Sequence, residues 1–276
     1  MFIRFGYELV YATPVPTHMI LMLQTHLGRG QQYVVADSMQ VNRTLPRSTF
    51  TDSFGNTCTR LELPAGPTRI TADAVIEDSG EPGPTSPAAD ELAVRDLPSE
   101  VLQFLLSSRY CDTEVMMSEA WRRFGNVEPG WARVQAICDF VHRHVAFDYR
   151  FARPTRTASE TYSERQGVCR DLVHLAITFC RCLNIPARYC TGYLGDIGVP
   201  AVEAPMDFAG CLEAYLGGQW HIFDPRHNVP RVGRILIARG RDAGDVAIST
   251  AFGPACLQQL KIWTDETDSH CLRQAS

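Results

Sequence analysis

Residues 163–189, SERQGVCRDLVHLAITFCRCLNIPARY, are the most informative stretch of the chain. From residue 169 to about residue 184, apolar side chains recur at the spacing of an amphipathic helix, with Leu172 central to a broad apolar arc and Arg170 on a narrow polar one. We therefore expect a helix that is buried on most of its circumference. Gly167 lets the backbone turn sharply into this helix, and Cys169 falls in its first turn.

A thiol at a helix start meets unsatisfied backbone N–H groups and the positive end of the helix dipole, which stabilise a thiolate. The same N–H groups could hold an oxyanion. Cys169 is therefore a candidate nucleophile. The chain has ten cysteines, however, so a buried core thiol that falls near a helix start by chance is the alternative interpretation.

A predicted β-hairpin supplies an acid that suits the nucleophile interpretation. Residues 209–216 and 219–224 read as strands, and Gly217-Gly218 suits a two-residue turn between them. Counting from the turn puts Cys211 opposite Asp224 and places Ala209 diagonal to the acid. A cysteine nucleophile needs a base, and the base needs a group that orients it. Asp224 would be the orienting acid, and position 209 would be the place for the base.

The rest of the chain divides into two regions. Short strand-like runs separated by turn residues predict a small antiparallel β-sandwich over residues 1–80, and a segment rich in Pro, Gly and acidic residues predicts a linker over 81–98. Residues 99–276 form the second region, in which helices precede consecutive strands. This order favours an α+β fold with an antiparallel sheet.

Composition excludes several classes of function. A formal charge of -5 without Lys/Arg clusters argues against a nucleic-acid or anionic-membrane partner, and no apolar run is long enough for a membrane span. The first residues lack the pattern of a signal peptide, so we expect a reduced, cytoplasmic chain. Neither Cys180 and Cys182 nor Cys169 and His174 have the spacing of zinc ligands on a helix. We therefore expect no metal and no other cofactor.

Three segments together resemble one family: RQGVCRDLVHLAITFCRCLNIPARYCTGYL (165–194), MDFAGCLEAYLGGQWHIFDPRHN (206–228) and GRILIARGRDAGDVAIST (233–250). They are similar to bacterial transglutaminase-like proteins of the cysteine protease type. TDSFGNTCTRLELPAG (51–66) and LPSEVLQFLLSSRYC (97–111) resemble the β-sandwich and the first helical segment of the same proteins. The resemblance implies a papain-like α+β core that performs acyl transfer or amide hydrolysis.

The resemblance also assigns the site residues. It makes Cys169 the nucleophile and Asp224 the orienting acid of a Cys-His-Asp triad. The histidine of the family falls on Ala209, and the aromatic residue that follows it falls on Cys211. This chain therefore departs from the family pattern at the base.

His227 is the substitute base that the sequence offers. His174 lies on the opposite side of its helix from Cys169, and His221 pairs with Ala214 on the wrong face of the hairpin. Pro225 should end the second strand, which leaves His227 in a loop near Asp224. A loop histidine that bonds backbone is the alternative for His227, and capping of a helix C-terminus is the interpretation of His142 and His144.

The sequence leaves three functions open. The first is a thiol enzyme that acts through Cys169 on a peptide or protein carboxamide. The second is a catalytically impaired module that uses the same cleft to bind a peptide or protein partner. The third is structural retention, with Cys169 in the core and Asp224 capping a turn. The sequence names no specific substrate and no oligomeric state.

Overall fold

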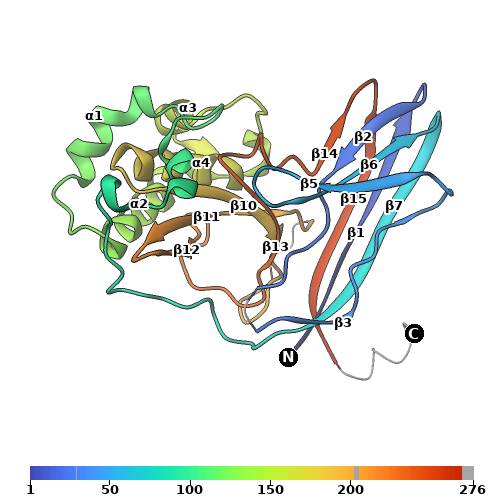
Figure 1. Ribbon diagram of the computed structural model, residues 1–276, viewed down its shortest axis with the longest axis horizontal. Helices are drawn as coiled ribbons and strands as arrows, with labels where there is room; N and C mark the ends of the chain where they lie inside the picture. The colour runs from blue at the N-terminus through green and yellow to red at the C-terminus, as the bar shows by residue number, and fades with distance from the viewer. Residues whose placement is uncertain (29, 202–204, 269–276) are drawn as a thin grey trace.

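The computed structural model describes residues 1–28, 30–201 and 205–268, and it has two parts that lie side by side. A β-sandwich of two antiparallel sheets forms one part, and a helical layer on a third sheet forms the other (Figure 1). This is the α+β architecture that the sequence predicts. Within the described ranges, no helix is both long and apolar enough to cross a membrane.

Long strands with alternating buried and exposed side chains build the sandwich. One sheet has the order β15-β1-β7-β3, with β4 also paired to β7, and the other has the order β14-β2-β6-β5. The two sheets enclose a core of aliphatic side chains such as Leu63 and Ile70, and the Phe5 ring packs on Tyr193 of the other part of the molecule. The N-terminal strands are β1 (Phe2–Thr13), β2 (Thr17–Leu21), β3 (Gln32–Val35), β4 (Gln40–Val41), β5 (Arg47–Thr51), β6 (Thr57–Leu63) and β7 (Gly66–Glu77).

The last part of the chain returns to the sandwich. β14 (Ser249–Ala251) pairs with β2, and β15 (Cys256–Thr267) pairs with β1 along almost its whole length. The region expected at residues 99–276 therefore includes two strands that hydrogen-bond to the N-terminal sheets. The first and last strands of the chain therefore both belong to the sandwich, and the helical part lies between them in the sequence.

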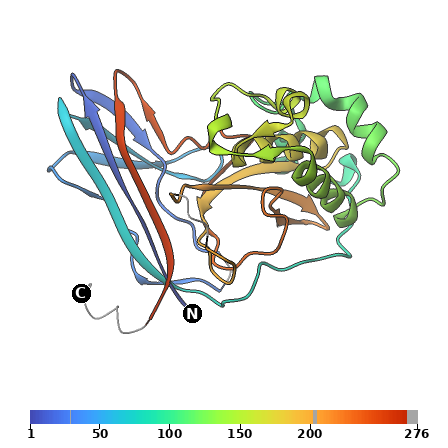
Figure 2. The same ribbon diagram turned by 180° about the vertical axis from the view of Figure 1, so that it is seen from behind.

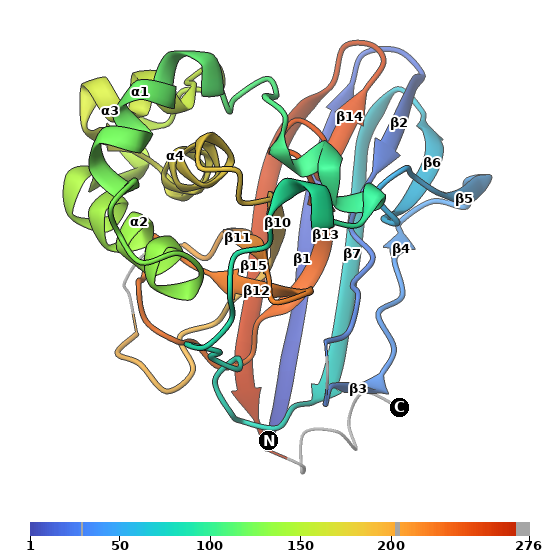
Figure 3. The same ribbon diagram turned by 60° about the vertical axis from the view of Figure 1, so that its left-hand side comes forward.

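Helix α4 (Cys169–Cys182) is the centre of the second part. It packs on β10 and β11, and three further helices surround it (Figure 3). All its residues except Arg170, which belongs to the polar arc, are buried, and the other polar side chains of the helix have internal partners. Arg181, for example, donates to the carbonyl oxygens of Ala187 and Leu106. The surrounding helices are α1 (Thr113–Phe124), α2 (Trp131–His144) and α3 (Ala158–Glu164).

The sheet beneath α4 has the order β12-β11-β10-β13 and is antiparallel throughout. Its strands are β10 (Ala187–Tyr193), β11 (Ala209–Leu216), β12 (Gln219–Phe223) and β13 (Ile235–Gly240). A short parallel pair, β8 (Ala146–Phe147) and β9 (Gln166–Gly167), leads the chain into α4.

The linker runs from the end of β7 along the bottom of the molecule to the helices (Figure 2). The second half of the linker is held against α2 and the hairpin turn. The Trp131 N–H donates to Ala89 O at 3.0 Å, the Gly217 N–H donates to Asp90 O at 2.8 Å, and Glu91 forms a 2.9 Å ion pair with Arg133. Two short 3₁₀ helices, η1 (Val94–Asp96) and η2 (Ser99–Leu105), follow before α1, and a third, η3 (Tyr149–Phe151), follows β8.

Candidate active site

Cys169 is the first residue of α4, as the sequence predicts. The turn before it is held by Asp171, whose carboxylate accepts a hydrogen bond from the Val168 N–H at 3.0 Å and pairs with Arg156 at 2.9 Å. A Cβ atom at Gly167 would lie 2.8 Å from Asp171 Cβ, so a side chain there would disturb this arrangement. Gly167 and Asp171 together fix the position of the thiol.

The Cys169 thiol is buried, with 7% of the residue exposed. Burial raises the pKa of the thiol above its ordinary value. The positive charge of Arg226 and the backbone N–H groups of Gly210 and Arg170 act in the opposite direction, and the carboxylate of Asp207 acts with burial. Because burial dominates, the thiol is mostly protonated at neutral pH.

Arg226 is held near the thiol by aromatic rings. Its guanidinium lies 4.1 Å from the centroid of the Phe147 ring and 5.8 Å from that of Tyr149, within the range of cation–π interactions. On another side of the thiol, a Cβ atom at Gly210 would lie 2.5 Å from the hydroxyl oxygen of Tyr189. Because residue 210 is glycine, the Tyr189 hydroxyl group can lie close to the backbone of residue 210, whose N–H acts on the Cys169 thiol.

The hairpin has the predicted register. Gly217 and Gly218 have φ values of 56° and 81°, which a two-residue turn requires. Tyr215 pairs with Trp220, and the last pair toward the site joins Leu212 to Phe223. The remaining pairs are Leu216–Gln219, Ala214–His221 and Glu213–Ile222.

Asp224 follows β12 directly and has more partners than the sequence suggests. Its Oδ1 accepts hydrogen bonds from the N–H groups of Arg226 and His227 at 3.0 and 3.1 Å. Its Oδ2 lies 2.9 Å from Nδ1 of His227 and 2.5 Å from Nη2 of Arg234. Burial alone would raise the pKa of this carboxyl group, but the Arg234 charge and the bonds from His227 hold it well below its usual range. Asp224 is an ionised carboxylate that caps a turn and pairs with Arg234, whose side chain is 13% exposed.

The structure joins His227 to Asp224, but not to Cys169. Among the described residues, no hydrogen bond or ion pair links the His227 ring to the thiol. His142 lies with Nδ1 2.9 Å from Arg226 O, so it contacts the carbonyl groups of the same turn. His221 Nε2 lies 3.2 Å from Leu216 O, and buried His174 stacks on Tyr110 with its Nε2 accepting from the Ala243 N–H.

Position 209, which the resemblance gives to the missing base, lies at the start of β11. Ala209 pairs with Gly192 on β10 and directly precedes the residue whose N–H acts on the Cys169 thiol. Sequence reasoning missed Arg226 and Arg234. Arg234 lies in the third family-like segment, but nothing in its spacing connects it with Asp224.

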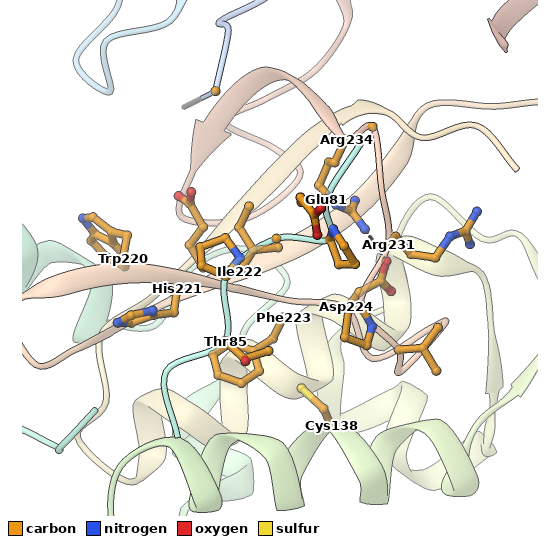
Figure 4. Close-up of a pocket in the computed structure, with 18 of the residues that line it drawn as sticks. Glu81, Thr85, Cys138, Trp220, His221, Ile222, Phe223, Asp224, Arg231 and Arg234 are labelled. Atoms are coloured by element: carbon orange, nitrogen blue, oxygen red, sulfur yellow. Dashed lines mark hydrogen bonds and ion pairs between the residues drawn. The ribbon is translucent and has the colours of Figure 1, made fainter. Parts of the chain in front are cut away.

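Asp224 lies in the wall of a cavity of about 440 Å³ (Figure 4). Side chains of β12, the loop after it, α2 and the linker line this cavity, including Cys138 below Asp224 and Thr85 of the linker. Cys169 does not line it. Within the described part of the chain, no cluster of His, Cys, Asp and Glu side chains could hold a metal ion.

Comparison with known proteins places this arrangement in a family. The family model of the transglutaminase-like superfamily matches residues 120–225, from α1 to just beyond Asp224. A solved structure from Cytophaga hutchinsonii, described as a "putative cysteine protease", is 31% identical in sequence with a TM-score of 0.82, over 97% of this chain and 92% of that one. The chain belongs to the transglutaminase-like superfamily.

Curated relatives of this transglutaminase-like protein include mycobacterial chains of similar length. An uncharacterised protein of Mycobacterium leprae is 26% identical over 248 residues, covering 86% of this chain and 87% of that protein. An uncharacterised protein of Mycobacterium tuberculosis is 26% identical over 223 residues, covering 72% and 70%. The expected family is thus confirmed, and the similarity to the Cytophaga hutchinsonii structure extends over nearly the whole chain, including the sandwich.

Proposed function

We propose that this protein is a thiol-dependent amide hydrolase or acyltransferase that acts on peptide or protein carboxamides through Cys169. The observation that carries the proposal is the thiol at the start of α4, where the N–H groups of Gly210 and Arg170 act to lower its pKa. These donors and the nearby charge of Arg226 favour negative charge at this point.

The reaction would proceed through a thioester. The Cys169 sulfur attacks the carbonyl carbon, and the carbonyl oxygen takes the negative charge of the tetrahedral intermediate. Collapse of that intermediate expels the amine, which takes up a proton, and leaves the acyl group on sulfur. Water or another amine then accepts the acyl group, which gives hydrolysis or transfer.

His227 is our candidate for the group that takes the thiol proton. Its Nδ1 is engaged by Asp224, so Nε2 is the ring atom that would accept the proton, as in a triad in which the acid orients the base. Asp224 would then serve this histidine while it also pairs with Arg234.

Turnover of peptide carboxamides tests the proposal. We expect release of ammonia or cleavage of peptides from a panel of glutamine- and asparagine-containing substrates, and we expect Cys169→Ser to lose all turnover above background. Cys138→Ala, which changes another buried thiol, on α2, should keep that turnover. Equal turnover in the wild type and Cys169→Ser would contradict the proposal.

The pH dependence of alkylation follows from the raised pKa of Cys169. Because the thiolate is the reactive form, the rate of iodoacetamide addition should rise about tenfold per pH unit up to at least pH 9, without levelling off. Peptide mapping of the alkylated chain at each pH measures the rate at Cys169, with N-acetylcysteine as a reference thiol. A plateau at or below pH 8 would show that the thiol is activated instead.

A second candidate is a peptide- or protein-binding module of the same fold that lacks catalysis. Ala209 at the expected position of the base, together with the burial of a protonated thiol, favours it. General-base assistance typically contributes about 10²- to 10⁴-fold, so its loss would leave turnover very slow. Restoring a histidine at position 209 separates the two candidates.

A further inference from the structure

Two buried cysteines face each other across the central strands of the sheet beneath α4. Cys190 on β10 pairs directly with Cys211 on β11. Both thiols are free, and the residues are 1% and 2% exposed. The proposed chemistry of Cys169 uses neither of them.

The register places the two sulfur atoms within bonding reach. Directly opposed residues of antiparallel strands have Cα atoms about 4.5–5.5 Å apart and side chains on the same face. That separation lies inside the range of about 4.4–6.8 Å found for disulfides. Each thiol influences the pKa of the other, as expected for side chains that lie next to each other. A disulfide between them therefore requires no new path of the backbone.

Cys211 also has the electrostatic setting of a reactive thiol. The neighbouring Cys190 thiol lowers the pKa of Cys211, and the positive charge of Arg234 acts in the same direction against burial. In contrast, burial raises the pKa of Cys138 on α2 and of Cys180 on α4. Oxidation generally selects the thiol with the greater thiolate character.

The cavity described above reaches neighbours of this pair, although neither cysteine lines it. Glu213 lies two residues beyond Cys211 on the same face of β11 and lines the cavity, as do Asp224 and Arg234. Arg234 is also the cation that acts on Cys211. In Figure 4 the side chains of Arg234 and Asp224 stand together at the cavity wall.

We propose that Cys190 and Cys211 are a redox-active dithiol that hydrogen peroxide converts into a cross-strand disulfide. The Cys211 thiolate attacks one peroxide oxygen and breaks the O–O bond, which gives a sulfenic acid and hydroxide. The Cys190 sulfur then attacks the Cys211 sulfur, the S–S bond forms, and the sulfenic oxygen leaves as water. The two thiol protons go to the two oxygens, so two thiols and one peroxide give one disulfide and two waters.

The disulfide is to be sought in the wild-type chain itself. The reduced, folded full chain is treated with hydrogen peroxide, alkylated in denaturant and digested, and the linked peptides are identified by mass spectrometry. We expect one dominant linkage, between the peptides that contain Cys190 and Cys211, with the loss of two hydrogen atoms. Because the linkage is identified in the wild type, the result does not depend on whether a variant folds.

Variants give the matched controls. Cys190→Ala and Cys211→Ala should each abolish the linkage completely, whereas Cys169→Ser and the exposed-site variant Cys256→Ser should retain it. The proposal is overturned if Cys190 and Cys211 remain fully alkylated after peroxide treatment, or if the dominant linkage joins other cysteines. Either result can be distinguished from failure of the proposed enzyme, since turnover through Cys169 is measured separately.

Discussion

The Ala209→His variant is expected to raise thiol-dependent turnover by about 10²- to 10⁴-fold over the wild type, the usual contribution of a general base. Residue 209 directly precedes Gly210, whose N–H acts on the Cys169 thiol, and Asp224 directly follows β12, the strand that pairs with β11. A histidine there would occupy the position that the family pattern gives to the base. The ratio kcat/KM on the best carboxamide of the panel measures the gain.

Two controls isolate the effect of the base. Ala209→Gln introduces a side chain of similar length that cannot take up a proton, so it should give no gain. Ala209→His combined with Cys169→Ser should also give none, because the nucleophile is absent. If Ala209→His leaves an active wild type unchanged, another base already serves, and His227→Gln should then reduce turnover. No activity in any variant would exclude the proposed enzyme and favour the binding module.

The Asp224→Asn variant is expected to lose about 3–5 kcal/mol of folding stability, the usual cost of removing one partner of a buried ion pair. Arg234 would keep its buried charge without the carboxylate that neutralises it at 2.5 Å. The N–H groups of Arg226 and His227 would also lose a charged acceptor. Denaturant unfolding of both chains at pH 7 measures the difference.

At low pH, the difference in folding stability between the wild type and Asp224→Asn should become smaller. The pKa of Asp224 is lowered in the folded protein, so its contribution to stability is complete above the unfolded value of about 3.9 and is lost as pH falls through the lower folded value. Asp96→Asn is the control. Its pair with Arg95 has side chains that are 60% and 86% exposed, so the loss should be about 0–1 kcal/mol. Equal losses in the two variants would contradict the role given to Arg234.

The hairpin shows what the sequence can predict. A Gly-Gly turn with alternating residues on both sides fixes the register by local geometry alone, and all the pairs from Leu216–Gln219 to Glu213–Ile222 follow from it. The start of α4 is similarly local, because Gly167 and the apolar period lie within one stretch of chain. The position of Cys169 and the place of position 209 at the start of β11 could therefore be predicted.

Contacts between distant segments could not be predicted in the same way. Arg234 directly precedes β13, which lies at the opposite edge of the sheet from β12. Its contact with Asp224 therefore depends on the path of the chain between these two strands, which local spacing does not show. Arg226 is placed by rings that precede α4. β15 pairs with β1 from more than 240 residues away, and its exposed residues 256–261 lack the alternation that marks a half-buried strand.

Acylation of Cys169 is the most direct test of the account. The full chain is mixed with an activated ester of a short peptide, quenched in acid and mapped by mass spectrometry. We predict one acyl group, on Cys169, at higher occupancy in Ala209→His and absent from Cys169→Ser. Hydrolysis of the ester with no acyl group on Cys169, or with the group on other cysteines at equal occupancy, would contradict the claim that this thiol is the nucleophile.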